Sequence, residues 1–157
     1  MTEDIKIRVH PDPVWRKRSN FIIRAQLPTE YHPWRFEQLF ARRLSENTFE
    51  ICCIPFFMYN IALGDVVATT ATEDSKYLVT SVVKPSGRYV FRVWFGESLR
   101  FARDITEKLE ALGSLIEWSS VNLLAVDAID QDHAQVVADL LAEHERLGHL
   151  VYETGRQ

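Results

Sequence analysis

The sequence predicts an α+β protein in which a strand-rich N-terminal part, residues 1–87, is followed by a C-terminal part, residues 88–157, that contains the helices. In the first part, short β-branched and aromatic segments follow one another with almost no helical periodicity between them. After Pro85-Ser86-Gly87, apolar residues recur alternately at strand spacing and at helix spacing. We therefore expect two subdomains with a hinge at these three residues.

Six segments of the N-terminal part are typical of strands and are bounded by Pro, Asn, Gly and Asp turn signals. They are residues 5–10, 21–26, 37–44, 49–54, 65–72 and 76–83. Several short strands with one face to bury predict a curled sheet or small barrel. Residues 36–44 also fit a period near four, so a single amphipathic helix remains an alternative there.

The C-terminal part begins with residues 89–95, whose β-branched and aromatic side chains predict a strand. Ser98 is placed to cap a following helix, and Gly113 is placed to end it in a left-handed conformation. The expected buried stripe of this helix consists of Leu99, Ala102, Ile105, Leu109 and Leu112.

Residues 115–126 predict two strands joined through the polar residues 119–122, a connection short enough to require a hairpin. Asp132 and Gln135 resemble a capping box, which predicts a second helix that ends at Gly148. Its expected buried side consists of Val136, Val137, Leu140, Leu141 and Leu147. Residues 150–154 close the unit as a fourth strand.

The resulting order is strand, helix, strand, strand, helix, strand. Right-handed crossovers place the fourth strand beside the first, with the third on the first strand's other side. This is the ferredoxin-like βαββαβ arrangement, which hosts enzymes, ligand sensors, RNA binders and interaction modules alike. The fold class therefore does not identify an activity.

Composition predicts a globular protein of the cytoplasm. The chain has 157 residues and 46% hydrophobic residues, enough for a packed core. It has no run of about 18 apolar residues. Its N-terminus carries Glu3 and Asp4 in place of the basic region of a secretory signal. We therefore expect no contact with membranes.

Charge is divided unevenly along the chain. Residues 1–88 hold 12 basic and 10 acidic residues, whereas residues 89–157 hold 6 basic and 12 acidic residues. An acidic C-terminal half argues against nucleic-acid binding, which needs a basic field. It fits a basic protein partner, for which Glu107, Glu110, Asp139 and Glu143 on the helices are candidates. The alternative is that these acids only solvate the helices.

The sequence contains no recognised catalytic motif. It lacks a glycine-rich phosphate loop and a Gly-x-Ser-x-Gly elbow. Cys52 and Cys53 are adjacent, so a disulfide between them would be strained, and free thiols are expected. No further metal ligands accompany them at suitable spacing. We therefore expect no metal, no cofactor and no enzymatic activity, with a reactive thiol as a minor alternative.

The first C-terminal strand offers a candidate surface. Alternation turns Tyr89, Phe91, Val93 and Phe95 toward the helices. It turns Val90, Arg92 and Trp94 the other way, with either Trp118 or Glu117 beside them. Because Arg and Trp are strong interface anchors, Arg92, Trp94 and Trp118 are candidate partner-binding residues. The alternative is that this face packs against the N-terminal part.

Several short motifs together resemble a known family. They are Phe-Glu-Ile-Cys-Cys-Ile-Pro-Phe-Phe at 49–57, Ile-Ala-Leu-Gly-Asp-Val-Val at 61–67, Val82-Val83, Ser86-Gly87, Leu112-Gly113 and Ala125-Val126-Asp127. The pattern resembles the bacterial family known as domain of unknown function 4265 (DUF4265), small soluble proteins, over most of the chain. The resemblance implies no activity and transfers no catalytic residue. The sequence departs from it in the Cys pair and in Arg16-Lys17-Arg18.

The first two motifs also have a purely physical explanation. Pro55 stops strand pairing, and Leu63-Gly64-Asp65 makes a tight turn. The functional alternative is that a ligand cleft lies between the subdomains. Its candidate lining residues are Phe56, Phe57, Tyr59 and Asp65.

These observations favour a non-catalytic intracellular binding protein that docks its acidic unit on a basic partner, such as a toxin or another effector. Bacterial immunity proteins are the example. A small-molecule-sensing regulatory domain is the second hypothesis, and an enzyme with Cys52 or Cys53 as nucleophile is the third. The sequence leaves monomer and homodimer equally open.

Overall fold

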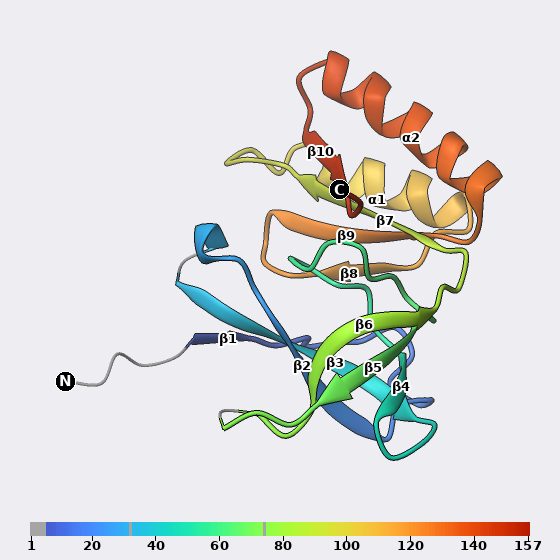
Figure 1. Cartoon of the computed structure of the whole chain (residues 1–157). Helices are drawn as coiled ribbons and strands as arrows, with labels where there is room; N and C mark the ends of the chain where they lie inside the picture. Colours follow the sequence, from blue (N-terminus) through green and yellow to red (C-terminus); the bar gives the residue numbers. More distant parts are fainter. Residues whose placement is uncertain (1–5, 32, 74) are drawn as a thin grey trace.

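The computed structural model describes residues 6–31, 33–73 and 75–157, in which two β-sheets and two α-helices form three layers (Figure 1). The N-terminal strands lie on one side of a four-stranded sheet, and both helices lie on its other side. Of the strand predicted at residues 5–10, Ile5 lies outside the described residues. No helix of the described part is long and apolar enough to cross a membrane.

The N-terminal strands form one closed sheet. Its strands are β1 (Lys6–Arg8), β2 (Phe21–Gln26), β3 (Trp34–Arg43), β4 (Thr48–Ile51), β5 (Val66–Thr70) and β6 (Leu78–Lys84). Their order is β1-β3-β2-β6-β5-β4. An additional pairing between β3 and β4 closes the five strands from β2 through β6 into a small barrel, with β1 at its edge. A short 3-10 turn, Thr29–Tyr31, connects β2 to β3. The strand-rich N-terminal part is therefore confirmed.

Residues 36–44 are part of a strand, so the alternative of a helix there is wrong. In β3, burial alternates with a period of two, with Glu37, Leu39 and Ala41 pointing inward. Pairing with β1, β2 and β4 along its length stabilises the extended form. The barrel core consists of Ile23, Ala25, Leu39, Ala41, Phe49, Ile51, Cys53, Ile61 and Val67.

The C-terminal sheet contains β7 (Tyr89–Trp94), β8 (Ile116–Trp118), β9 (Leu123–Ala128) and β10 (Val151–Thr154). Its order is β10-β7-β9-β8, and every neighbouring pair is antiparallel. The predicted pairing of the first strand with both the third and the fourth is confirmed. Helices α1 (Ala102–Ala111) and α2 (Gln131–Arg146) pack on the face formed by Phe91, Val93 and Phe95.

Both helices begin at residues other than those predicted. Helix α1 follows Phe101, which makes no side-chain cap, so Ser98 does not cap it and Leu99 is exposed. Helix α2 is capped by Asp130, whose Oδ1 accepts a hydrogen bond of 2.8 Å from the backbone N–H of His133. The predicted capping box at Asp132 is therefore wrong, because the carboxylate two residues earlier already satisfies the first turn.

The predicted buried stripes are only partly correct. Val137 and Leu141 of α2 are buried, whereas Val136 of α2 is exposed, as are Leu112 and Leu147, which cap the C-termini of α1 and α2. The helix ends are as expected, since Gly113 and Gly148 have φ of +93° and +80°.

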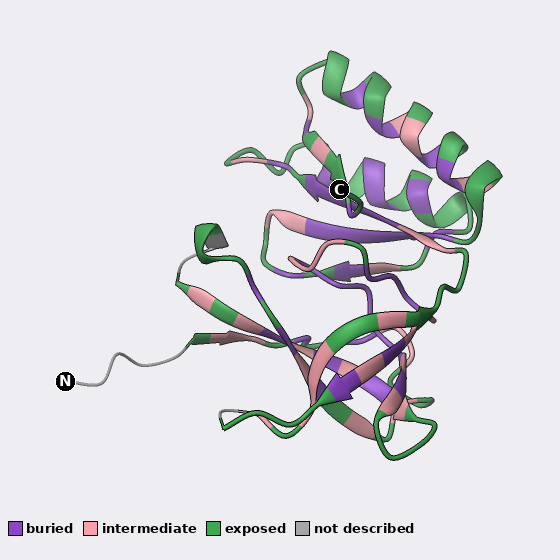
Figure 2. Ribbon diagram, viewed as in Figure 1, coloured by how far each residue is buried: buried purple, intermediate pink, exposed green. Residues whose placement is uncertain are grey.

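The second face of the C-terminal sheet packs against the barrel, as one of the two alternatives predicted. Ile54, Phe56 and Leu63, from the segment between β4 and β5, contact Val90 and Ala125 of the sheet. Figure 2 shows this segment as buried between the two layers. The junction of the two sheets is therefore part of the core.

Candidate functional site

A buried ionic cluster joins three distant parts of the chain at this junction. Nε2 of His10 lies 2.7 Å from Oε2 of Glu37 on β3, and Nδ1 lies 2.8 Å from Oε1 of Glu117 on β8. All three side chains are almost completely buried. We refer to these residues as the His10 cluster.

The two carboxylates of the His10 cluster also fix the segment that connects the sheets. Glu37 accepts backbone N–H groups from Phe56, Phe57 and Met58 at 2.6, 3.0 and 3.1 Å. Glu117 accepts the N–H of Ile54 at 2.5 Å. The cluster therefore stabilises the path of the chain between the barrel and the sheet.

In the His10 cluster, the histidine and the carboxylates stabilise one another's charged forms. Burial by itself lowers the pKa of His10, but Cys53 and the hydrogen bonds with Glu117 and Glu37 raise it well above its ordinary value. Burial raises the pKa of Glu37, but hydrogen bonds from His10 and from backbone N–H groups bring it below its ordinary value. Since a carboxylate faces each ring nitrogen, His10 is an imidazolium that donates from both.

The two cysteines are free thiols, as predicted, and both are buried. Burial, followed by the charge of Glu50, raises the pKa of Cys52 to about 12. Burial also raises the pKa of Cys53, although His10 opposes it. Neither thiol is an accessible nucleophile in this structure. Within residues 6–31, 33–73 and 75–157, no group of three His, Cys, Asp or Glu side chains is arranged to hold a metal ion.

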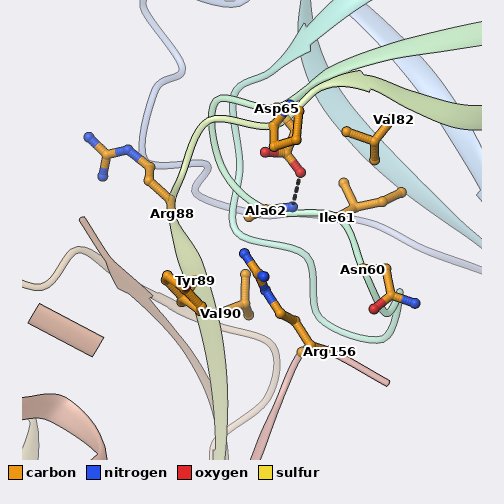
Figure 3. Close-up of a pocket in the computed structure, with 11 residues that line it drawn as sticks. Asn60, Ile61, Ala62, Asp65, Val82, Arg88, Tyr89, Val90 and Arg156 are labelled. Atoms are coloured by element: carbon orange, nitrogen blue, oxygen red, sulfur yellow. Dashed lines mark hydrogen bonds between the residues drawn. The ribbon is translucent and has the colours of Figure 1, made fainter. Parts of the chain in front are cut away.

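One pocket at the junction, of about 200 Å³, lies beside Asp65 (Figure 3). Asp65 accepts backbone N–H groups from Ala62 at 2.9 Å and from Ser86 at 2.7 Å. Arg156 extends between the two walls, with its guanidinium 4.1 Å from the centre of the Tyr89 ring. Asp65, a predicted cleft residue, therefore lines a pocket, but both of its oxygens already stabilise turns.

A second pocket, of about 240 Å³, lies where the segment after β4 meets the sheet. Its lining residues are Phe56, Phe57, Arg92, Trp94, Leu123, Val151, Tyr152 and Glu153. We call it the Arg92 groove. It brings together two of the predicted cleft residues, Phe56 and Phe57, and two residues predicted from strand alternation, Arg92 and Trp94.

Arg92 is almost fully buried at this groove and forms an ion pair with one acidic residue of the described part of the chain. Its Nη1 lies 3.4 Å from Oε1 of Glu153, which is half exposed, and its Nη2 donates to the carbonyl oxygen of Met58. Its Nε is buried and has no hydrogen-bond partner among the described residues. The guanidinium therefore retains an unused donor.

The remaining predicted cleft residue, Tyr59, lines neither of these pockets but supports the groove. Its ring centre lies 4.8 Å from Cζ of Arg92, and its hydroxyl donates to Oε2 of Glu153 at 2.7 Å. Tyr59 thus holds both charged residues in position. The four predicted cleft residues are divided between two pockets and a supporting position.

Trp118 does not lie beside Arg92 and Trp94. The register of β8 and β9 places Trp118 opposite Leu124, on the helix-covered face, where its ring lies 5.8 Å from that of Phe95. Glu117 occupies the other face, opposite Ala125. Of the two alternatives that the sequence left open, Glu117 is the correct one.

The predicted acidic residues lie away from the groove, on the helix layer. Glu107, Glu110, Asp139 and Glu143 are all exposed. Glu107 pairs with Arg103 at 3.1 Å, and Glu143 pairs with Arg146 at 2.6 Å. The sheet separates the helices from the Arg92 groove. The four acidic residues and the pair Arg92 and Trp94 therefore belong to two different surfaces.

Asp127, at the end of β9, is a further buried acid. Its Oδ2 lies 2.5 Å from Nη1 of Arg88, but its Oδ1 has no hydrogen-bond partner in the part of the chain that the structure describes. Burial raises the pKa of Asp127 to about 6, and the ion pair with Arg88 only partly opposes this rise. The ion pair with Arg88 therefore only partly offsets the cost of burying the Asp127 carboxylate.

Comparison with known proteins agrees with this fold. A search among curated proteins finds no match. A crystal structure described as a novel structure of a hypothetical protein from Neisseria gonorrhoeae is similar, with a TM-score of 0.71 and 22% identity. The alignment covers 84% of this chain and 91% of that protein, and at this identity it shows a shared fold only. The model of the family described as Domain of unknown function (DUF4265) matches residues 37–152, so the chain belongs to this family.

Proposed function

We propose that this protein is a non-catalytic intracellular binding protein that docks a basic protein partner on the outer side of its helix layer. One observation carries the proposal. Asp132, Val136, Asp139 and Glu143 of α2 and Leu147, the residue that caps its C-terminus, are all exposed and recur at helical spacing. We call them the α2 stripe.

The chemistry of the α2 stripe suits a protein surface. Helices α1 and α2 together contain seven acidic and three basic residues. Val136 and Leu147 are each about half exposed, so apolar contact area lies among the acids. Protein interfaces combine such apolar area with complementary charge, which also speeds the encounter of the partners.

The states of His10, Cys52 and Cys53 at the junction support a role without catalysis. The imidazolium of His10 is held between two carboxylates, and both thiols are buried with raised pKa values. Groups in these states are poor nucleophiles and poor general bases.

We propose that residues 88–157 form a ferredoxin-like unit, supported by the strand order β10-β7-β9-β8 and by two helices on one face. An immunity-type inhibitor that neutralises a basic toxin or another effector fits an acidic, stable docking face. It can act in the cytoplasm as a monomer or as a homodimer.

Charge reversal on the α2 stripe tests this function. Tagged wild-type protein and the Asp139→Lys/Glu143→Lys variant are used for quantitative affinity capture from the protein's own cells. Glu46→Lys, a reversal at an exposed barrel loop, serves as the matched control. We expect one basic protein near one-to-one stoichiometry with wild type and with Glu46→Lys, and its loss with the double variant. Retention of this protein by the double variant would refute the docking face.

A second candidate function is small-molecule sensing, because both pockets at the junction are built from the barrel side and the sheet together. Ligands commonly bind at such interfaces within a chain. A metabolite that raises the melting temperature in proportion to its concentration is the expected sign.

A further inference from the structure

We infer that the Arg92 groove binds a small aromatic carboxylate. This inference rests on the second candidate function, small-molecule sensing, and is independent of the docking face on α2. It depends on the apolar walls of the groove, the buried guanidinium beside them and the position of Glu153.

The walls of the groove suit a flat apolar group. Phe56 and Phe57 come from the segment after β4, and Trp94 and Val151 form a directly paired position of β7 and β10. Trp94 and Val151 are 49% and 56% exposed, although they are large apolar side chains. An aromatic ring between them would remove this area from water.

The polar end of the groove suits a carboxylate. The Arg92 side chain is 4% exposed, and among the described residues its charge is balanced only by Glu153 at 3.4 Å, longer than a well-formed charged hydrogen bond. Its Nε has no acceptor in the described residues. A buried cation whose one acidic neighbour among the described residues lies at this distance favours a ligand that brings a negative charge.

The size of the groove limits the ligand to a single ring with a short acidic arm. A cavity of about 150 Å³ is sufficient for benzene. The Arg92 groove, at about 240 Å³, has additional room for a carboxymethyl group. Larger fused systems would extend into solvent.

Glu153 makes the proposal sharply testable, because its carboxylate lies 3.4 Å from Nη1 of Arg92 and would repel a ligand carboxylate bound beside the same guanidinium. Glu153 is half exposed, so Glu153→Gln is compatible with folding and keeps an acceptor for the Tyr59 hydroxyl. Removing this negative charge is expected to strengthen binding of an anionic ligand and to leave a neutral one unaffected.

The experiment is a calorimetric titration of the full chain with phenylacetate and with its neutral isostere phenylacetamide. We expect phenylacetate to bind wild type at least ~10-fold more tightly than phenylacetamide, because only the carboxylate pairs with Arg92. Glu153→Gln should tighten phenylacetate binding by roughly 3-fold to 10-fold. Trp94→Ala should weaken it about 10-fold through lost ring contact.

Specific outcomes would overturn the inference. These are equal affinity for phenylacetate and phenylacetamide, no gain in Glu153→Gln, or unchanged affinity in Trp94→Ala. The Asp139→Lys/Glu143→Lys variant should bind phenylacetate as wild type does, which separates the groove from the docking face. If phenylacetate fails while another class of metabolite raises the melting temperature, small-molecule sensing stands and the aromatic carboxylate is excluded.

Discussion

Nδ1 of His10 lies 2.8 Å from Oε1 of Glu117, a buried contact between residues 107 positions apart in the chain. His10 follows β1, an edge strand of the N-terminal sheet, and Glu117 lies in β8, an edge strand of the C-terminal sheet. Because Glu37 holds the other ring nitrogen, one imidazolium connects both sheets. This link makes the stability of the whole chain depend on three ionisable groups.

Replacement of His10 by Gln is expected to lower the free energy of unfolding by about 3 to 5 kcal/mol at pH 7, because two buried carboxylates lose their cation. Urea denaturation measures this change. Circular dichroism establishes that the variant is folded before denaturant is added. A loss of less than about 1 kcal/mol would show that the cluster does not stabilise the junction.

The raised pKa of His10 also predicts a pH dependence. The folded protein holds this proton more tightly than the unfolded chain does, so the stabilisation is fully present below the ordinary pKa of histidine, about 6.5. It is lost as the pH rises through the raised pKa. The free energy of unfolding of wild type should therefore decline in alkaline solution, and that of His10→Gln should decline less. Parallel profiles for the two proteins would contradict this assignment.

Glu117→Gln tests the carboxylate on the other side of the same contact. The variant keeps the shape of the side chain but removes the charge beside His10, and we expect it to destabilise the protein by about 2 to 4 kcal/mol. Glu110→Gln is the matched control, since Glu110 is exposed on α1 and should change stability by less than about 0.5 kcal/mol. Equal melting temperatures for the two variants would refute the role of Glu117.

Local patterns in the sequence predict much of this fold. Alternation along residues 89–95 correctly places Phe91 toward the helices and Arg92 on the opposite face, because side-chain direction in a strand depends only on neighbouring residues. The glycines at 113 and 148 likewise mark helix ends through their own backbone conformation. Both signals act within a few residues.

Features that depend on distant contacts are not predictable in the same way. The sequence predicts Glu37 only as one residue of a strand. Its burial becomes favourable because His10 and three backbone N–H groups of the segment after β4 form hydrogen bonds with it. The Arg92 groove has the same origin. Its aromatic wall and its arginine are each visible in the sequence, but strand register and the path of the chain after β4 bring them together.

Asp127→Asn is expected to stabilise the protein at neutral pH. Burial raises the pKa of Asp127 to about 6 from 3.8, so the folded state binds the proton more tightly and the charged form opposes folding. The penalty is absent below about pH 4 and complete above about pH 6, where it reaches roughly 3 kcal/mol. The variant should therefore exceed wild type in melting temperature at pH 8 and equal it at pH 4. The reverse order at pH 8 would show that the ion pair with Arg88 outweighs burial.

The buried thiols predict slow chemical labelling. Cys52 has a pKa of about 12 and Cys53 a pKa raised by burial, and neither is exposed to solvent. A disulfide reagent such as dithiobis-nitrobenzoate at neutral pH should therefore modify the native protein only as fast as it opens, and both thiols rapidly in urea. Cys52→Ser and Cys53→Ser assign each rate to its residue. Rapid and selective labelling of one thiol in the native protein would instead support the hypothesis of a thiol-dependent enzyme, because only an accessible thiolate reacts in this way.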